Sequence, residues 1–274
     1  MSVIPEFILQ MRSITPEEVH LWRGSPEQRA LRSLAGKFGR FAYFDRELDF
    51  PDWTGKKVLD FGGNEGALLL DHDCQISPEN YYCLDVISEA LAEGRKRFPQ
   101  AHWFHYNRYN CSFNPQGIKH LPVPDMGVEF DFILAYSVFT HTTREDMHTL
   151  LEQLRSRLAA GGALAFTFID PTYVPWPYRV NNLRFRLEKN HRMIPAGEID
   201  GLLKKSRDAD WCALVDGSEI HVNNSGDWSD EARDCLSYNV YYTVDFLRQE
   251  FPEATIRPPV NGEMQHCCLM RGAA

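Results

Sequence analysis

The chain has 274 residues and a mass of 31.6 kDa, which is long enough for one large α/β domain with additions. Its hydrophobic fraction of 43% and charged fraction of 24% are those of a globular protein with a buried core, and they exclude a disordered chain or a fibrous repeat. The formal net charge of −9 opposes non-specific binding to the phosphates of nucleic acid or anionic lipid.

No apolar stretch approaches the roughly 20 residues of a membrane helix, and the first residues, which include Glu6, do not match a secretory signal. We therefore expect a cytoplasmic protein with no membrane partner. The seven cysteines are scattered and form no CxxC pair, so the sequence indicates reduced thiols and no metal site.

Seven short apolar runs are predicted to be strands, and several are apolar on both faces, as buried parallel strands are. They lie at residues 57–61, 81–85, 101–106, 130–136, 162–169, 254–257 and 265–270. Because helical patterns alternate with these runs, the sequence predicts an α/β fold. Its centre is a doubly wound, mostly parallel seven-stranded sheet with helices on both faces.

The clearest helix is predicted at residues 143–160, where apolar residues recur at helical spacing behind a capping box that starts at Thr143. Ser88 and Thr243 are expected to cap two more helices. A further helix is expected to start at Ala67, directly after a glycine-rich turn.

Two segments interrupt this alternation and define the expected domains. The expected parts are a helical N-terminal cap (residues 1–50), a core (51–170 and 240–274) and a substrate lid (171–239). Additions to such a sheet usually cover the carboxyl edge of the strands, where ligands bind. Within the lid, residues 211–222 are predicted to form a β-hairpin with a type I′ turn at Asp216 and Gly217.

The first predicted strand leads directly into the glycine-rich turn, which reads Asp60-Phe61-Gly62-Gly63-Asn64-Glu65-Gly66. A tight turn against a ligand needs residues that tolerate a positive φ and expose bare backbone, as glycine does freely and asparagine more readily than most. Asp85 closes the second predicted strand, a position from which a carboxylate accepts hydrogen bonds from a ribose diol. These features together predict an adenosine-binding half of the sheet.

On these residues the chain resembles the class I S-adenosylmethionine-dependent methyltransferases, and in particular their small-molecule branch. The first motif of that family places an acid before alternating glycines, as residues 58–66 do here, with Asn64 in place of the usual middle glycine. Residues 130–141 resemble the family's fourth-strand motif, and residues 158–166 resemble its turn from helix into fifth strand.

The resemblance implies S-adenosyl-L-methionine as the cofactor and a set of residues that bind it. By similarity, Asp60 would lie near the methionine amino group, Asp85 on the ribose and Asn107 near the adenine amine. The expected cofactor-binding residues are Asp60, Gly62, Gly63, Asn64, Gly66, Asp85, Val86, Asn107, Tyr136 and Ser137.

Methyl transfer from a sulfonium requires the protein mainly to align the methyl acceptor and to exclude water, and proximity contributes roughly 7 to 11 kcal/mol. A hydroxyl or ammonium acceptor must also lose a proton to a base. His141, just past the fourth predicted strand, is the predicted general base. The alternative for His141 is a helix-entry residue that bonds local backbone.

Substrate-binding residues are expected at the end of the fifth strand and in the lid. They are Asp170, Tyr173, Trp176, Tyr178 and Arg179. This set suits a small molecule that has an aromatic ring or an acidic group, although the same residues also fit a lid core and a solvated helix face. The motif typical of enzymes that act on base amines is absent from the fourth-strand position, so no nucleic-acid substrate is expected.

Two alternatives use the same sheet. A nicotinamide-dependent oxidoreductase would share the glycine turn and the ribose acid, although the chain has no Tyr-x-x-x-Lys pair. A non-catalytic relative of the methyltransferases would bind the cofactor or a protein partner. The sequence favours a methyltransferase, with oxygen preferred over nitrogen or carbon as the accepting atom, and it indicates no oligomeric state.

Overall fold

The computed structural model describes residues 39–110, 113–170, 211–215, 220–222, 238–260 and 265–272. Of the predicted N-terminal cap, the structure describes residues 39–50. Of the predicted lid, it describes residues 211–215, 220–222 and 238–239, all of which belong to strands.

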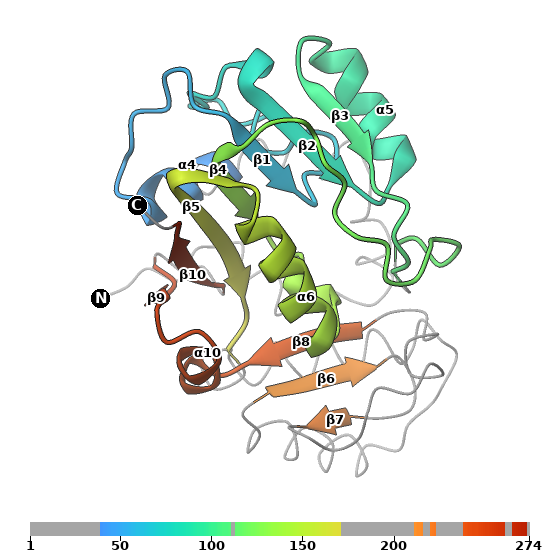
Figure 1. Cartoon of the computed structure of the whole chain (residues 1–274), viewed down its shortest axis with the longest axis vertical. Helices are drawn as coiled ribbons and strands as arrows, with labels where there is room; N and C mark the ends of the chain where they lie inside the picture. The colour runs from blue at the N-terminus through green and yellow to red at the C-terminus, as the bar shows by residue number, and fades with distance from the viewer. Residues whose placement is uncertain are drawn as a thin grey trace, which may run out of the picture.

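A seven-stranded sheet forms the centre of the described chain (Figure 1). Its strands lie in the order β3-β2-β1-β4-β5-β10-β9. They are β1 (Val58–Phe61), β2 (Tyr81–Asp85), β3 (His102–His105), β4 (Phe130–Ala135), β5 (Leu158–Phe168), β9 (Thr255–Arg257) and β10 (His266–Arg271). The first five strands pair in parallel, whereas β10 runs antiparallel to both of its neighbours. The predicted mostly parallel, seven-stranded α/β sheet is confirmed.

Alternation of side chains along the strands gives the sheet two buried faces. In β4, Ile133 and Ala135 belong to one apolar cluster, whereas Phe132 and Leu134 belong to another. The first cluster includes residues of α6 (Arg144–Arg155) and α10 (Val244–Glu250), and the second includes residues of α4 (Arg40–Glu47) and α5 (Ser88–Arg97). Helices therefore cover both faces, as the alternating sequence pattern predicts.

Side-chain caps begin two of these helices at the predicted residues. Thr143 and Thr243 each accept a hydrogen bond from the backbone N–H three residues further on, at 3.0 Å and 3.2 Å. The predicted cap by Ser88 is wrong. Ile87 is the N-cap of α5, and Ser88 is already the first helical residue, with its hydroxyl bonded to the side chain of Glu89.

The boundary between α6 and β5 lies earlier in the chain than predicted. The helix ends at Arg155 instead of residue 160, and β5 begins at Leu158 instead of residue 162. Leu158 pairs with Phe130 before an irregularity in the register, so β5 extends backwards along β4. The backbone groups of the chain from Leu158 onward therefore belong to the sheet, whereas the sequence pattern predicted that residues 158–160 form the last turn of the helix.

The helix expected from Ala67 is absent, because residues 64–70 form consecutive turns. Ala67 N donates to Gly63 O at 3.0 Å and Leu70 N donates to Gly66 O at 3.1 Å, and the chain then leaves the helical path. The carboxylate of Asp71 accepts a hydrogen bond from Phe41 N at 2.6 Å and so ties this segment to the start of α4.

A second sheet has three antiparallel strands in the order β7-β6-β8, beside the end of β5 in Figure 1. They are β6 (Trp211–Val215), β7 (Ile220–Val222) and β8 (Tyr238–Tyr242). The predicted pairing of β6 with β7 is confirmed, but its register is wrong by one residue. Leu214 pairs with Ile220, whereas a two-residue turn would place it opposite Glu219.

The two sheets are linked at the end of β5, where Tyr242 N donates a hydrogen bond to Ile169 O at 3.1 Å. β8 therefore spans the expected boundary between lid and core at residue 240. Within the described residues, every helix is too short or too polar to cross a lipid bilayer.

Candidate active site

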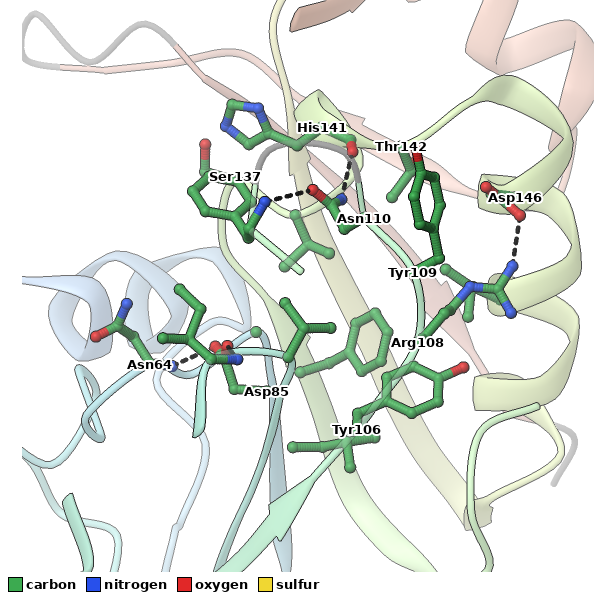
Figure 2. A pocket seen from close by; sticks show the side chains of 18 of the residues that line it. Asn64, Asp85, Tyr106, Arg108, Tyr109, Asn110, Ser137, His141, Thr142 and Asp146 are labelled. Carbon is green, nitrogen blue, oxygen red and sulfur yellow. Dashed lines mark hydrogen bonds and ion pairs between the residues drawn. The ribbon is translucent and has the colours of Figure 1, made fainter. Parts of the chain in front are cut away.

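A cavity of about 300 Å³ opens at the carboxyl ends of β1, β2 and β4. The strand order reverses between β1 and β4, and open α/β sheets bind ligands at such a reversal. The cavity wall includes residues from the segments 61–64, 84–87, 106–120 and 136–150, together with Arg40 of α4. Figure 2 shows Asn64 and Asp85 at one end and Asn110, His141 and Thr142 at the other.

The turn after β1 has the backbone conformation that its sequence predicts. Gly62 and Asn64 both have positive φ, at 77° and 57°, and both line the cavity. A Cβ atom on Gly62 would lie 2.4 Å from the side chain of Val138, so only glycine fits where this turn crosses the segment after β4.

The structure does not bring the predicted residues Gly63 and Gly66 into the cavity wall. A Cβ atom on Gly63 would lie 2.7 Å from Asp60 and Cys83, and one on Gly66 would lie 2.8 Å from Trp103. These two glycines permit close packing of the turn against the sheet, which is the other physical reason for glycine in such a motif.

Asp60 also lies outside the cavity wall, beneath the turn. The residue is only 1% exposed and accepts a hydrogen bond from the Tyr81 hydroxyl at 2.6 Å. Burial raises the pKa of the Asp60 carboxyl to about 6, against the opposing effect of the Tyr81 hydrogen bond. In this arrangement Asp60 joins β1 to β2.

Asp85 lies at the end of β2 and lines the cavity, as does Val86 after it. Its carboxylate oxygens accept hydrogen bonds from Asn64 N at 2.7 Å and Ile87 N at 2.8 Å. Burial raises the pKa of Asp85, while these backbone bonds oppose the rise. Because each oxygen keeps a further lone pair, the fixed carboxylate can still accept hydrogen bonds from a ligand diol.

Asn107 does not line the cavity, in contrast to the expectation that it meets an adenine. Its side-chain oxygen accepts a hydrogen bond from Asn114 Nδ2 at 3.1 Å, and its backbone oxygen accepts one from Ile118 N at 2.7 Å. These bonds hold Asn107 within its own loop. The neighbouring Tyr106 lines the cavity instead.

Tyr136 and Ser137 line the cavity just after β4, as predicted. Ser137 has a φ of 58°, and its N–H donates to Thr167 Oγ1 at 2.7 Å. The Thr167 hydroxyl in turn donates to the side-chain oxygen of Gln265. This chain of bonds from β4 through β5 fixes a backbone conformation that few non-glycine residues adopt.

Sequence reasoning missed Arg40, which enters the cavity wall from the first residue of α4. Its guanidinium lies 5.2 Å from the centre of the Tyr136 ring. Arg40 Nη1 is buried and has no hydrogen-bond partner within the part of the chain that the structure describes. A buried guanidinium nitrogen beside a cavity favours an anionic ligand group.

His141 lines the cavity at the end of the short helix η3 (Phe139–His141). Its ring packs edge-on against Phe113, with 5.2 Å between ring centres. Its backbone N donates to Val138 O at 2.9 Å, and its backbone O accepts from Asn110 Nδ2 at 2.9 Å. The backbone thus has the local bonds of a helix-entry residue, while the imidazole belongs to the cavity wall.

The connection between β3 and β4 supplies the remaining wall, which sequence reasoning also missed. The guanidinium of Arg108 pairs with Asp146 of α6 and donates to Leu121 O at 2.5 Å. Lys119 Nζ lies 5.4 Å from the centre of the Tyr109 ring. No spacing pattern in the sequence relates these residues to one another, because they meet only through the folded loop.

The predicted substrate residue Asp170 is buried and does not line the cavity. Its carboxylate accepts a hydrogen bond from Val244 N at 3.0 Å, so it joins β5 to the start of α10. The other predicted substrate residues, Tyr173, Trp176, Tyr178 and Arg179, lie outside the described residues. Within the described ranges, no group of three His, Cys, Asp or Glu side chains is placed to hold a metal ion.

Residues 59–164 match the family model for a methyltransferase domain. The chain is also similar to a tRNA U34 carboxymethyltransferase from Campylobacter hominis, with 27% identity over 154 residues. This match covers 56% of the chain and 49% of that protein, so the chain spans about half the length of this curated relative.

Two solved structures have a similar arrangement. One is magnesium protoporphyrin IX methyltransferase from Synechocystis PCC 6803, with 10% identity, a TM-score of 0.48, and coverage of 98% of this chain and 95% of that one. The other is an S-adenosylmethionine dependent methyltransferase from Mesorhizobium loti, with 14% identity, a TM-score of 0.47, and coverage of 86% and 99%. Both TM-scores are below 0.5.

Proposed function

We propose that the chain transfers the methyl group of S-adenosyl-L-methionine to a small molecule, because residues 59–164 match the family model for a methyltransferase domain and the sheet has the strand order of a doubly wound fold. The observation that carries this proposal is the carboxylate of Asp85. Two backbone N–H groups hold it at the end of β2, where it lines a cavity at the reversal of strand order. A carboxylate so placed suits the ribose diol of an adenosine.

The cofactor half of the cavity consists of the residues that follow β1, β2 and β4. In our proposal the cofactor-binding residues are Gly62, Asn64, Asp85, Val86, Tyr136 and Ser137, with Arg40 in addition. The Arg40 guanidinium pairs with the carboxylate of the cofactor's methionine part, and this pairing satisfies the buried Nη1.

The cofactor supplies an electrophilic methyl group on a sulfonium, so the protein has no bond to activate on that side. The chain's own residues align the methyl acceptor and exclude water, which together are worth roughly 7 to 11 kcal/mol. For a hydroxyl acceptor, the His141 imidazole would take the hydroxyl proton as the methyl carbon bonds to oxygen and its bond to sulfur breaks, which leaves S-adenosylhomocysteine and an imidazolium. His141 lies in the cavity wall, opposite the end that holds Asp85 (Figure 2).

A second candidate acceptor is tRNA, which the name of the Campylobacter hominis relative favours. The net charge of −9 opposes it, because binding to RNA depends largely on neutralising phosphates. Incubation with tritiated S-adenosylmethionine and a total cell extract separates the two candidates. A labelled compound below 3 kDa that separates from S-adenosylmethionine on chromatography and is absent without the protein supports a small molecule. Label that runs with purified tRNA identifies tRNA as the acceptor.

Calorimetry with S-adenosylhomocysteine tests the cofactor site directly. We expect Asp85→Ala to weaken its binding by about 1.5 to 3 kcal/mol, because charged hydrogen bonds to the ribose are lost. Asp245→Ala is the matched control, since that carboxylate is 84% exposed on α10 and should leave the affinity unchanged. An unchanged dissociation constant in Asp85→Ala removes Asp85 from the site.

Thermal unfolding with added ligands separates the methyltransferase from the oxidoreductase alternative. S-adenosylhomocysteine at a hundred times its dissociation constant should stabilise the protein by about 2.7 kcal/mol. NADH at the same concentration should have no effect. Stabilisation by NADH alone would favour the oxidoreductase, and stabilisation by neither ligand would contradict a cofactor site.

A further inference from the structure

Arg40 enters the cavity wall from the first turn of α4, so its position depends on what holds that turn. Buried rings fix the helix against the sheet, namely those of Phe41, Tyr43 and Phe44. The first N–H groups of a helix have no partner within the helix itself. Gly39, the N-cap residue, has no side chain that could satisfy them. The first turn of α4 therefore needs a cap from elsewhere in the chain.

Asp71 supplies this cap from a segment 30 residues away. Its carboxylate accepts a hydrogen bond from Phe41 N at 2.6 Å. Burial raises the pKa of Asp71, while hydrogen bonds from the backbone N–H groups of Phe41 and Ala42 oppose the rise. Phe41 and Ala42 are the second and third residues of α4, whose N–H groups an N-cap side chain ordinarily binds. A carboxylate at this end is also favoured by the helix dipole.

Gly39 leaves the space that this carboxylate occupies. A Cβ atom on Gly39 would lie 2.0 Å from Oδ2 of Asp71. The φ of −57° at Gly39 is open to any residue, so space and not backbone conformation requires the glycine. Gly39 and Asp71 therefore fit each other at the start of α4.

Asp71 also ends the segment that follows the glycine-rich turn. Leu70 N donates to Gly66 O at 3.1 Å, and Asp71 N donates to Leu68 O at 3.3 Å. Leu68 is fully buried, which packs the segment against the sheet. The turn that places Asn64 in the cavity wall thus continues, through a hydrogen-bonded path, to the carboxylate that caps α4.

We propose that Asp71 is a positioning residue for the cofactor, which caps α4 and so holds Arg40 where it can bind the carboxylate of the cofactor's methionine part. The inference rests on the proposed function for the identity of that ligand. Asp71 lies outside the cavity wall, so it acts through Arg40.

A role of the Asp71 charge alone would have the opposite sign. The Arg40 guanidinium and the Asp71 carboxylate attract each other, so loss of that negative charge leaves Arg40 with more attraction for a ligand anion. Loss of the cap instead frees the turn that carries Arg40. Removal of the Asp71 carboxylate therefore strengthens binding if only charge matters and weakens it if position matters.

Calorimetry with two ligands tests the proposal. S-adenosylhomocysteine has the amino acid part, whereas 5′-methylthioadenosine lacks it. We expect Asp71→Ala to bind S-adenosylhomocysteine about fivefold more weakly and 5′-methylthioadenosine within twofold of the unchanged protein. Asp71→Asn keeps an oxygen that can accept from Phe41 N, so it should bind S-adenosylhomocysteine no more than twofold more weakly than the unchanged protein.

A second substitution should rescue Asp71→Ala. Gly39→Ser in that background introduces a hydroxyl at the N-cap, and the carboxylate that a Cβ atom would have met is gone. The double variant should regain the affinity for S-adenosylhomocysteine to within twofold. Asp73→Ala is the matched control, because Asp73 is 72% exposed in the same segment and should leave both affinities unchanged.

Hydrogen exchange in the absence of ligand measures the cap itself. The amides of Phe41 and Ala42 should exchange at least fivefold faster in Asp71→Ala than in the unchanged protein. Exchange at the same rate would overturn the proposal. So would unchanged or tighter binding of S-adenosylhomocysteine to Asp71→Ala, an equal loss for both ligands, or a loss that persists in both variants with a restored cap.

The unchanged protein distinguishes this inference from the proposed function. If it binds neither ligand, the proposed function fails and the inference fails with it. If it binds S-adenosylhomocysteine and Asp71→Ala binds equally well, the cofactor site stands and only the role of Asp71 is wrong.

Discussion

The two halves of the cavity are built in different ways. Residues of the cofactor half, such as Gly62, Asp85 and Ser137, each follow the end of a strand, so their position depends on where that strand stops. The loop between β3 and β4 (residues 106–110 and 113–121), which we call the acceptor loop, is held instead by contacts between distant residues, including Arg108 with Asp146. Local sequence therefore specifies most of the proposed cofactor half, whereas long-range contacts specify the wall that the loop between β3 and β4 forms.

Breaking the contact between Arg108 and Asp146 should have the largest effect. Arg108→Met leaves a carboxylate that is only 24% exposed without its cation, and we expect a loss of about 3 kcal/mol in the free energy of unfolding. Urea denaturation measures this loss. Folded Arg108→Met should still bind S-adenosylhomocysteine normally, because the cofactor half does not depend on the pair.

Arg155→Met provides the matched control for this experiment. Arg155 pairs with Glu253 on the surface, with both side chains more than 40% exposed, and such pairs contribute at most about 1 kcal/mol. Equal losses in the two variants would show that the Arg108 pair does not anchor the acceptor loop.

Asp60→Asn tests the structural role of an acid that family resemblance places at the cofactor. The folded pKa of about 6 lies above the ordinary value of 3.8, so the unfolded chain ionises first and stability falls as pH rises from about 4 to above 6. The difference of 6 − 3.8 corresponds to roughly 3 kcal/mol. Asparagine keeps an oxygen that accepts a hydrogen bond from the Tyr81 hydroxyl. We therefore expect the free energy of unfolding of Asp60→Asn, measured by urea denaturation, to show no such fall between pH 4 and pH 7.

Binding measurements then separate the two roles of Asp60. Since Asp60 lies outside the cavity wall, S-adenosylhomocysteine should bind the variant within threefold of the unchanged protein. A tenfold or greater loss, with no change in the pH dependence of stability, would instead support the direct contact with the methionine amino group that the resemblance implies.

His141→Ala tests catalysis in the acceptor half. If His141 is the general base, the turnover number should fall at least a hundredfold, which is about 2.7 kcal/mol, with little change in cofactor affinity. Initial rates of S-adenosylhomocysteine release per folded molecule measure it, with the acceptor found by tritium labelling. A variant within threefold of the unchanged enzyme from pH 6 to 9 would leave alignment as the main source of catalysis.

The sequence predicts the strands and the glycine turn well because both depend on local patterns. The positive φ of Asn64 and the place of Asp85 follow from the end of a strand and the need for a tight turn. Gly66 and Asn107 lie outside the cavity wall. For Asn107 the reason is that a motif does not specify which way a side chain turns. Glycine spacing alone does not distinguish room for a ligand from room for the Trp103 ring.

Arg40 and the acceptor loop were not predictable for a different reason. Arg40 belongs to a helix outside the matched domain, and no periodicity marks it as different from other surface arginines. Lys119 and Phe113 come together with His141 only because the loop folds back onto η3 and α6. Patterns in a single sequence indicate which residues are neighbours along the chain. Lys119, Phe113 and His141 are neighbours only in space, through tertiary contacts.

The smallest expected effect concerns Arg40, the residue of α4 that completes the cofactor half. Arg40→Met keeps an apolar side chain on the Tyr136 ring but removes the charge, and we expect S-adenosylhomocysteine to bind about tenfold more weakly, or about 1.4 kcal/mol. 5′-Methylthioadenosine lacks the amino acid part, so its affinity should change less than twofold. Arg46→Met on the same helix, outside the cavity wall, should affect neither ligand. If both ligands weaken equally in Arg40→Met, Arg40 acts by positioning α4, and if neither weakens, the carboxylate is bound elsewhere.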